Sequence, residues 1–441
     1  MAFVHNQSCE CLKSELDLFS VPPTQTSIES GSFVEYHPIA SITNDSSTIE
    51  FVIPGSGQDY CDLASTQLYV RAEITKATGL PLAATDEVGP VNLFLHSLFS
   101  DVEIKLNDVS VTSSNNTYPY RAYLETLLSY APPAKQTQLT SAMYYKDEAG
   151  HMEDANPLAA DAQKGIKTRH SFFTDGKIVD MMGCIHADLF FQDRYLPSDV
   201  GLRVRLLRSK DSFCLMSTHP NSRFKVKIHE CKLYMRKVKL SPSIFVAHAK
   251  ALEAGNCKYP IRRVICKTFT IPTGNLDCVQ ENVFSGTLPT RLVIGIVDNE
   301  SYNGNYERNC FNFKHYSLTQ LKVVLDGQQQ HYINPVEPNF AANRYIEAYM
   351  SMFSGTGKNR KDEGTDISRT DFPGGYAIYC FDLTPDQSED THFNLSRDGS
   401  LRLDLKFATA LPNTVNVIVY GEFEQVIEID RNKQVIFDFT T

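Results

Sequence analysis

The chain has 441 residues, which is too long for one ordinary domain and fits two domains of about 200 residues each. Its composition, with 42% hydrophobic and 21% charged residues, is that of a folded globular protein and excludes a disordered or fibrous one. The formal net charge is −10, without long runs of one sign, so the surface as a whole does not attract the phosphates of nucleic acid.

The first 30 residues predict an extended N-terminal arm. This segment holds one basic residue, Lys13, and therefore lacks the charge of an arm that binds nucleic acid. Neither a secretory signal nor a membrane-spanning apolar stretch is visible in the chain, so we expect a soluble protein made in the cytosol. We predict that the arm packs beneath a neighbouring subunit or a cementing protein, the alternative being a disordered tail. The apolar residues expected to make this assembly contact are Leu16, Leu18, Phe19 and Val21.

Alternation of apolar and polar residues predicts β-strands along most of the chain, because successive side chains of a strand point to opposite faces. In the first half, the apolar positions are Leu68, Val70, Ala72 and Ile74; Val102, Ile104 and Leu106; Leu202, Val204 and Leu206; and Val226 and Ile228. In the second half, they are Leu401, Leu403, Leu405 and Phe407, then Val415, Val417 and Val419. We expect one face of each strand to be buried in a core.

Helical periodicity is rare and indicates three short helices. Two are predicted by apolar stripes at Tyr123, Leu124, Leu127 and Leu128, and at Tyr345, Ile346, Tyr349, Met350 and Phe353. The third has Ser241 as its N-cap, Pro242 at its first position and Gly255 as its stop. This helix lies near the middle of the chain, where a connector between two domains is expected.

The two halves of the chain resemble each other in the order of their elements. The matching pairs of segments are Val102–Asp108 with Leu321–Gly327, Tyr123–Ser129 with Tyr345–Ser351, Leu202–Leu206 with Leu401–Leu405, and Phe224–Ile228 with Val415–Val419. The shared order of strand, helix, strand and strand, at displacements of roughly 190 to 220 residues, predicts two copies of one fold. The first copy has a longer connection, Ala131–Asp180, which we expect to project from the surface.

Antiparallel strands with one apolar face, few helices and long connections favour a jelly roll over a parallel α/β sheet. We therefore predict an all-β protein of two tandem antiparallel eight-stranded jelly-roll barrels, a double jelly roll, with a few short helices. The expected limits are 1–30 for the arm, 31–240 for the first jelly roll, 241–256 for the linker helix and 257–441 for the second jelly roll.

Five segments carry a resemblance to a known family. They are Ser14–Phe19, Pro22–Ile28, Asn92–Phe99, Phe191–Tyr195 and Phe311–Tyr316, and the similarity extends from about Ser14 to Phe439. These segments look like the major capsid protein of Polinton (Maverick) elements and the related adintoviruses. The resemblance implies a double jelly-roll protein of which three copies form a pseudo-hexameric capsomer, or hexon, that tiles an icosahedral capsid.

The resemblance also implies the partners of the chain. These are two further copies in a homotrimer, neighbouring capsomers, and penton and minor capsid proteins, all within the virion shell. No catalytic residue carries over, and no direct sequence-specific contact with nucleic acid is implied. Contact with a membrane, the size of the shell and the compartment of assembly stay open.

Enzymatic and metal chemistry find little support in the residue pattern. Ser354–Lys358 resembles a phosphate-binding loop, but Met352 and Asn359 stand where that loop needs Gly and Ser or Thr, which favours glycines that end a helix. His186 and His229 could converge into a metal site, although isolated histidines in a β protein are more often core or surface residues. Eleven cysteines without a CxxC pair favour reduced thiols. We expect no enzyme, no cofactor and no metal.

Two alternative functions stay open. A jelly roll can serve as a carbohydrate-binding module, although the absence of Trp argues against aromatic stacking platforms. A double-barrel hydrolase of glycans or amides would need a pair of carboxylates that converge at the domain junction, which a sequence cannot display. The basic segment Arg223–Lys239 could bind nucleic acid or an acidic partner, but we favour the solvated face of a strand.

Overall fold

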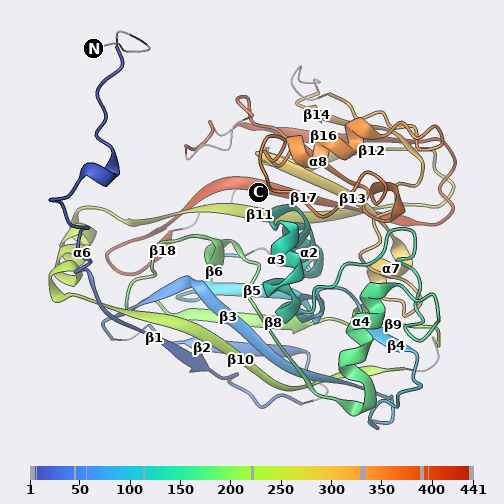
Figure 1. The fold of residues 1–441 in the computed structure, drawn as a ribbon, viewed down its shortest axis with the longest axis horizontal. Helices are drawn as coiled ribbons and strands as arrows, with labels where there is room; N and C mark the ends of the chain where they lie inside the picture. Colours follow the sequence, from blue (N-terminus) through green and yellow to red (C-terminus); the bar gives the residue numbers. More distant parts are fainter. Residues whose placement is uncertain are drawn as a thin grey trace.

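The computed structural model describes residues 5, 7–43, 46–55, 57–112, 115–219, 223–327, 334–387, 392–395 and 397–436. The last five residues of the predicted second domain lie outside this part of the chain. Figure 1 shows two strand-rich halves, the first from blue to green and the second from yellow to red, with the helix α2 (Tyr118–Ser129) between them.

The first half is a sandwich of two antiparallel four-stranded sheets. One sheet contains, in spatial order, β1 (Ile28–Tyr36), β10 (Lys225–Leu240), β3 (Asp59–Thr75) and β7 (Val179–Gly183). The other contains β2 (Thr48–Ile53), β8 (Leu202–Arg208), β5 (Phe99–Leu106) and β6 (Val109–Ser110). Two short strands, β4 (Val88–Pro90) and β9 (Leu215–Ser217), pair separately.

The second half repeats this arrangement. One sheet contains β11 (Cys257–Ile271), β17 (Val415–Ile429), β13 (Arg291–Asp298) and β15 (Ile378–Asp382), with β18 (Val435–Ile436) paired to β17. The other contains β12 (Asp277–Thr287), β16 (Asp398–Phe407) and β14 (Leu318–Leu325). An isolated bridge between Leu321 and Val336 occupies the outer position that β6 takes in the first half.

Both halves are jelly rolls with the same order of strands. In the first half β10 lies between β1 and β3, and β8 lies between β2 and β5; in the second half β17 lies between β11 and β13, and β16 lies between β12 and β14. The four matched segment pairs fall on equivalent elements, which are β5 with β14, α2 with α8, β8 with β16, and β10 with β17. The prediction of a double jelly roll is confirmed, while the predicted domain limits stay a prediction.

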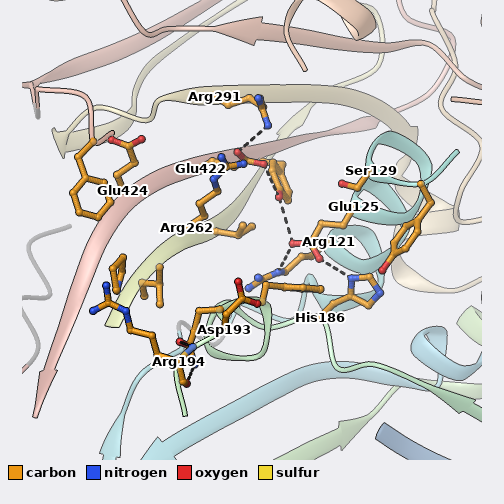
Figure 2. Close-up of a pocket in the computed structure, with 18 of the residues that line it drawn as sticks. Arg121, Glu125, Ser129, His186, Asp193, Arg194, Arg262, Arg291, Glu422 and Glu424 are labelled. Carbon is orange, nitrogen blue, oxygen red and sulfur yellow. Dashed lines mark hydrogen bonds and ion pairs between the residues drawn. The ribbon is translucent and has the colours of Figure 1, made fainter. Parts of the chain in front are cut away.

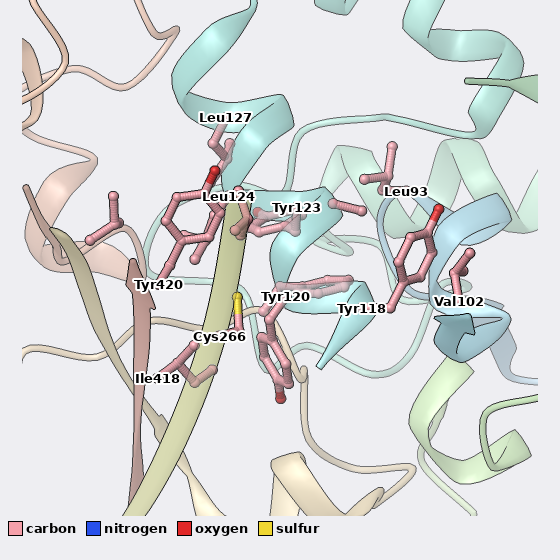
Figure 3. Close-up of a cluster of buried hydrophobic side chains, with 14 of the residues drawn as sticks. Leu93, Val102, Tyr118, Tyr120, Tyr123, Leu124, Leu127, Cys266, Ile418 and Tyr420 are labelled. Atoms are coloured by element: carbon pink, nitrogen blue, oxygen red, sulfur yellow. The ribbon is translucent and has the colours of Figure 1, made fainter. Parts of the chain in front are cut away.

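The predicted alternation is confirmed on the strands that carry it. Leu68, Val70, Ala72 and Ile74 of β3 are all fully buried, and so are Leu401, Leu403 and Leu405 of β16. On β17, however, residues on the face opposite to the predicted apolar positions, such as Ile418 and Tyr420, are buried as well. The reason is that α2 lies against that face of the strand, so both faces of β17 are covered (Figure 3).

The three predicted helices are present, but they differ in how they pack. The predicted apolar stripe of α2 is buried. In α8 (Ile346–Ser354), Ala348 and Met352 are buried while Ile346 and Met350 are exposed, so the predicted stripe faces the core only in part. In α6 (Pro242–Ala254), Ser241 and Gly255 are the caps as predicted, and no residue of the helix is fully buried.

The remaining helices are short. They are α1 (Phe94–Ser97), α3 (Pro132–Gln136), α4 (Lys164–Phe173), α5 (Asp211–Cys214), α7 (Asn299–Asn303), and the 3-10 turns η1 (Ser14–Leu16), η2 (Gln138–Ala142), η3 (Thr174–Gly176), η4 (Asp188–Phe191) and η5 (Phe372–Gly374). Within the described residues, no helix is both long and apolar enough to cross a membrane.

The long connection Ala131–Asp180 lies at the surface, as predicted, only in part, because some of its residues are buried between the two halves. Its Asp147 is fully buried in an ion pair with Arg169 at 2.7 Å and accepts a hydrogen bond from Asn309 of the second half. The Lys135 ammonium donates to the carbonyls of Leu127 and Thr365, at 2.8 and 2.6 Å. The buried part of the connection thus supplies polar groups that join the two halves.

Candidate functional site

The junction between the two jelly rolls is built around the aromatic face of α2. Tyr123 stacks on Phe311 with ring centroids 4.2 Å apart, and Tyr120 stacks on Tyr302 at 5.6 Å. Figure 3 shows the side chains of α2 directed at Cys266 of β11 and at Ile418 and Tyr420 of β17. Buried aromatic surface of this kind contributes both apolar burial and favourable ring geometry, so the junction is a packed core.

A buried ion-pair network continues this junction. Arg121 on α2 binds Glu125 one turn later at 2.9 Å and Asp188 at 2.6 Å. The same oxygen of Asp188 accepts the backbone N–H of Val264 in β11 at 3.1 Å. His186 donates from Nδ1 to the other oxygen of Glu125 at 2.6 Å. The network therefore connects α2 of the first jelly roll to the backbone of the second.

On the second jelly roll, the network extends along β17. The Tyr420 hydroxyl lies between two carboxylates, 3.3 Å from Glu125 and 3.1 Å from Glu422. Glu422 is in turn bound by Arg291 at 3.2 Å, and Arg291 donates to the carbonyl of Gly355 at 2.8 Å. Each of these carboxylates thus has an arginine partner, which offsets the cost of removing its charge from water.

A cleft of about 660 Å³ between the jelly rolls is lined by six of these residues, which are Arg121, Glu125, His186, Arg291, Tyr420 and Glu422 (Figure 2). Figure 2 shows Arg262, Arg291 and Glu422 on the second jelly roll facing Glu125 and His186 of the first. Both sides of the cleft carry acidic and basic side chains. Asp193, Arg194 and Glu424 also line the cleft.

The structure thus contains the feature that the hydrolase alternative required, namely carboxylates that converge at the domain junction. Glycoside hydrolysis needs one carboxyl that is protonated at neutral pH. Burial alone would raise the pKa of Glu125, but the charge of Arg121 and the hydrogen bond from His186 outweigh it and lower that pKa below its usual value. A lowered pKa favours the ionised form of Glu125 and disfavours it as that general acid.

The histidines considered for a metal site have separate partners. His186 binds Glu125 inside the junction, whereas His229 on β10 lies 3.2 Å from Glu73 on β3. Across the described ranges, no group of three or more histidine, cysteine or acidic residues is arranged to hold a metal ion. All eleven cysteines are free thiols. Lys358 of the loop that resembles a phosphate-binding motif is buried and donates to the carbonyl of Ser129.

In the basic segment Arg223–Lys239, four of the seven Lys and Arg side chains pair with acidic residues. The pairs are Lys227 with Glu73, Lys232 with Glu230, Arg236 with Asp62, and Lys239 with Glu29, at 2.9 to 3.0 Å. Because these charges are largely neutralised within the protein, they offer little attraction to a phosphate backbone. This supports the interpretation of an ordinary strand face.

The residues of the arm that are predicted to make an assembly contact are exposed to solvent. Leu16, Leu18, Phe19 and Val21 are 62%, 75%, 97% and 86% exposed. In Figure 1 the arm, in dark blue, extends away from the jelly rolls beside α6. Four large apolar side chains exposed along one short segment are unusual for a chain that acts alone.

Sequence reasoning missed the ion-pair network of the junction. Arg121 and Glu125 are spaced for one face of a helix, and that pair was detectable. Asp188, Tyr420 and Glu422 come from distant segments, so no local pattern could place them together. Two of the segments behind the family resemblance do lie at this junction, since Phe311 stacks on Tyr123 and Arg194 donates to the carbonyl of Lys258.

Comparison with known proteins identifies the fold. No family profile matches the chain. An uncharacterized protein of Caenorhabditis elegans is 26% identical over 432 residues, which cover 95% of this chain and 99% of the relative. Among solved structures, a chain of the Sputnik virophage aligns with a TM-score of 0.66 at 11% identity, over 99% of this chain and 94% of that one. The fold is the double jelly roll of viral major capsid proteins.

Two further double jelly rolls align over nearly their full length. The Faustovirus major capsid protein has a TM-score of 0.60 at 8% identity and covers 95% of this chain, with 92% of its own length aligned. The mavirus major capsid protein has a TM-score of 0.54 at 13% identity and covers all of this chain, with 97% of its own length aligned. At these identities the likeness is one of fold, and membership among Polinton and adintovirus capsid proteins stays a prediction.

Proposed function

We propose that this chain is a major capsid protein that assembles with copies of itself into an icosahedral virion shell. The observation that carries the proposal is that both jelly rolls and their connection, and not one module alone, align with major capsid proteins. A carbohydrate-binding module would need only one of the two jelly rolls. The proposal includes the Polinton and adintovirus group, which the sequence resemblance implies.

The capsomer we propose is a homotrimer with pseudo-hexameric outline. The two jelly rolls share one order of strands, so three copies would present six similar modules around an axis. Such a trimer would need the two modules of each copy to be held in a fixed relation. The aromatic stacks of α2 and the buried ion pairs of Arg121 and Glu422 supply that rigidity.

The contacts beyond the trimer would involve the N-terminal arm. Its exposed apolar side chains are suited to burial beneath a neighbouring subunit, a penton protein or a minor capsid protein. The paired charges of β10 support a shell that does not bind the genome sequence-specifically. On this proposal the chain is made in the cytosol and acts in the virion.

The mass of the purified protein in solution tests this proposal. Light scattering should give about three times 49.6 kDa at micromolar concentration, because permanent interfaces of capsid type bury on the order of 2,000 Å² or more. A strict monomer at all accessible concentrations would contradict the trimer. It would strengthen the alternatives of a carbohydrate-binding module or a hydrolase that uses the charged cleft.

A further inference from the structure

One face of α8 is exposed although its counterpart on α2 is buried. In the repeat of the two halves, Ile346 corresponds to Leu124, which is 1% exposed, but Ile346 itself is 40% exposed. Met350 corresponds to Leu128, which is 6% exposed, but Met350 itself is 36% exposed. The helix α8 therefore has the apolar side chains of a packing face that a single chain leaves uncovered.

The face of α2 is buried because the second jelly roll covers it. The side chains of α2 lie against β11 and β17 (Figure 3), and Glu125 lies 3.3 Å from the hydroxyl of Tyr420 on β17. In the first jelly roll, β1 and β10 take the places of β11 and β17. Figure 1 shows α8 and β10 on opposite sides of the molecule, so α8 can reach this sheet only on a second copy.

A groove of about 610 Å³ beside the exposed face of α8 is acidic. Its lining includes Glu337, Glu347 and Asp382 and no lysine, arginine or histidine. Glu337 accepts a hydrogen bond from the amide of Gln320 at 2.7 Å, and Asp382 accepts one from the backbone N–H of Thr384 at 2.9 Å. Within the part of the chain that the structure describes, no cation forms an ion pair with these three carboxylates. The groove therefore suits a basic partner.

The outward face of β10 is basic. The segment Arg223–Lys239 holds seven lysines and arginines but one acidic residue, Glu230. Acidic side chains of neighbouring strands offset part of this charge. Lys227 is nevertheless 40% exposed beside its partner Glu73, and Lys225 has no acidic partner among the described residues. This face is the electrostatic complement of the groove beside α8.

The same face also presents aromatic surface. Tyr69 of β3 and Tyr234 of β10 pack edge to face, with ring centroids 6.2 Å apart, and both are half-buried. Phe33 of β1 is paired in register with Arg236 of β10, so both side chains point to this side of the sheet, and Phe33 is 61% exposed. Aromatic side chains among charged ones are typical of a surface that binds another protein.

We propose that Ile346, Glu347 and Met350 of α8 pack on the outward face of the β1–β10–β3 sheet of a second copy. The contact repeats between copies the packing of α2 on the β11–β17 sheet within one chain. This inference rests on the proposed trimer, because three such contacts, each from the second jelly roll of one copy to the first of the next, close a ring. The acidic groove faces Lys225 and Lys227, so the charges also fix the orientation of the two copies.

Zero-length cross-linking of the assembled full-length protein tests the position of this contact. A carbodiimide joins a carboxylate directly to a lysine amine, and mass spectrometry of the digested trimer identifies the joined peptides. We expect Glu347 to be joined to Lys225 or Lys227. Because α8 and β10 lie on opposite sides of one chain, this product can form only between copies. Glu253, an exposed carboxylate on α6, should give no such product and is the control.

Charge reversal at Glu347 tests the contribution of the contact to assembly. Glu347 is exposed, so Glu347→Lys should leave the circular dichroism spectrum unchanged, but its new charge faces the lysines of β10. The trimer should therefore dissociate at concentrations roughly tenfold higher or more. Met350→Asp should act in the same direction. Glu253→Lys makes the same change of charge on α6 and should leave the trimer intact.

The failure of this interface can be told apart from the failure of the trimer. A wild-type trimer that gives no cross-link from α8 to β10, and whose dissociation Glu347→Lys and Met350→Asp leave unchanged, would overturn the interface while the proposed trimer stands. A wild-type monomer at all concentrations would overturn both.

Discussion

The Asp188 carboxylate joins the two jelly rolls through a single oxygen, which accepts Arg121 at 2.6 Å and the backbone N–H of Val264 at 3.1 Å. Asp188→Asn keeps the shape and the acceptor for Val264 but removes the charge. Arg121 then stays buried with only Glu125 as its partner. We expect a loss of roughly 3 kcal/mol in the free energy of unfolding, since breaking a buried pair leaves an uncompensated charge.

The exposed pair of Arg203 and Glu50 is the control for this prediction. The two side chains are 43% and 36% exposed and lie 3.3 Å apart. Arg203→Gln should change the stability by less than about 1 kcal/mol, because solvent screens exposed ion pairs. Urea unfolding followed by circular dichroism measures both variants, the chain having no Trp. Equal effects would mean that the junction is not a stabilising element.

Gly295 on β13 faces the ring of Phe313 with no room for a side chain. A Cβ atom at Gly295 would lie 2.4 Å from Cδ1 of Phe313, which is itself fully buried. Gly295→Ala should therefore lower the stability by about 1 to 3 kcal/mol through overpacking. Gly255→Ala, after α6, places its Cβ where no atom lies within 4 Å and should be close to neutral. Comparable unfolding midpoints for the two variants would contradict the close packing of Gly295 against Phe313.

The buried Lys135 should make the free energy of unfolding increase with pH. Burial lowers the pKa of its ammonium group to about 7, an effect that Asp366 opposes in part and Lys146 and Lys358 reinforce. In the unfolded chain that pKa is about 10.4. The folded state therefore binds this proton more weakly than the unfolded chain does. As a result, the free energy of unfolding is highest above pH 10.4, and it decreases as the pH falls to 7.

The Lys135→Met variant isolates this contribution. The difference in unfolding free energy between the wild type and this variant should grow by about 2 to 3 kcal/mol from pH 7 to pH 9, because one pH unit corresponds to about 1.4 kcal/mol. Lys250→Met, at an exposed position of α6, should show no such trend. A difference that stays flat between pH 7 and pH 9 would mean that Lys135 keeps its proton throughout.

Removal of residues 1–24 should separate folding from assembly. The apolar residues of the arm are exposed, and β1 begins only at Ile28, so the truncated chain should unfold at the same temperature as the wild type. Its trimers should nevertheless fail to form shells. Replacing Leu16, Leu18, Phe19 and Val21 by Ser in the full-length chain should have the same effect. Shells formed normally by the truncated chain would show that the arm is dispensable.

The strands and capped helices were predictable from the sequence because their signals are local. Alternation at Leu401, Leu403 and Leu405 depends only on which side of a strand faces the core, and the Ser241–Pro242 start of α6 depends on backbone chemistry within one turn. The repeated order of elements then indicated two copies of one fold. The folded protein retains these local elements because their local preferences agree with the tertiary structure.

The junction was not predictable because its contacts join residues that are far apart in the sequence. Arg121 and Asp188 are 67 residues apart, and Asp188 and Val264 are 76 residues apart, so their contact exists only after both jelly rolls have formed. The inward packing of part of Ala131–Asp180 depends on the same context, since its polar composition is typical of an exposed loop. The burial of both faces of β17 likewise follows from the position of α2.

Electron microscopy of the purified, concentrated protein tests the central claim most directly. If the chain is a double jelly-roll capsid protein, the images should show pseudo-hexagonal capsomers of three copies, alone or in curved sheets and closed shells. Particles of a single copy that never associate, at concentrations up to those used for crystallisation, would contradict it.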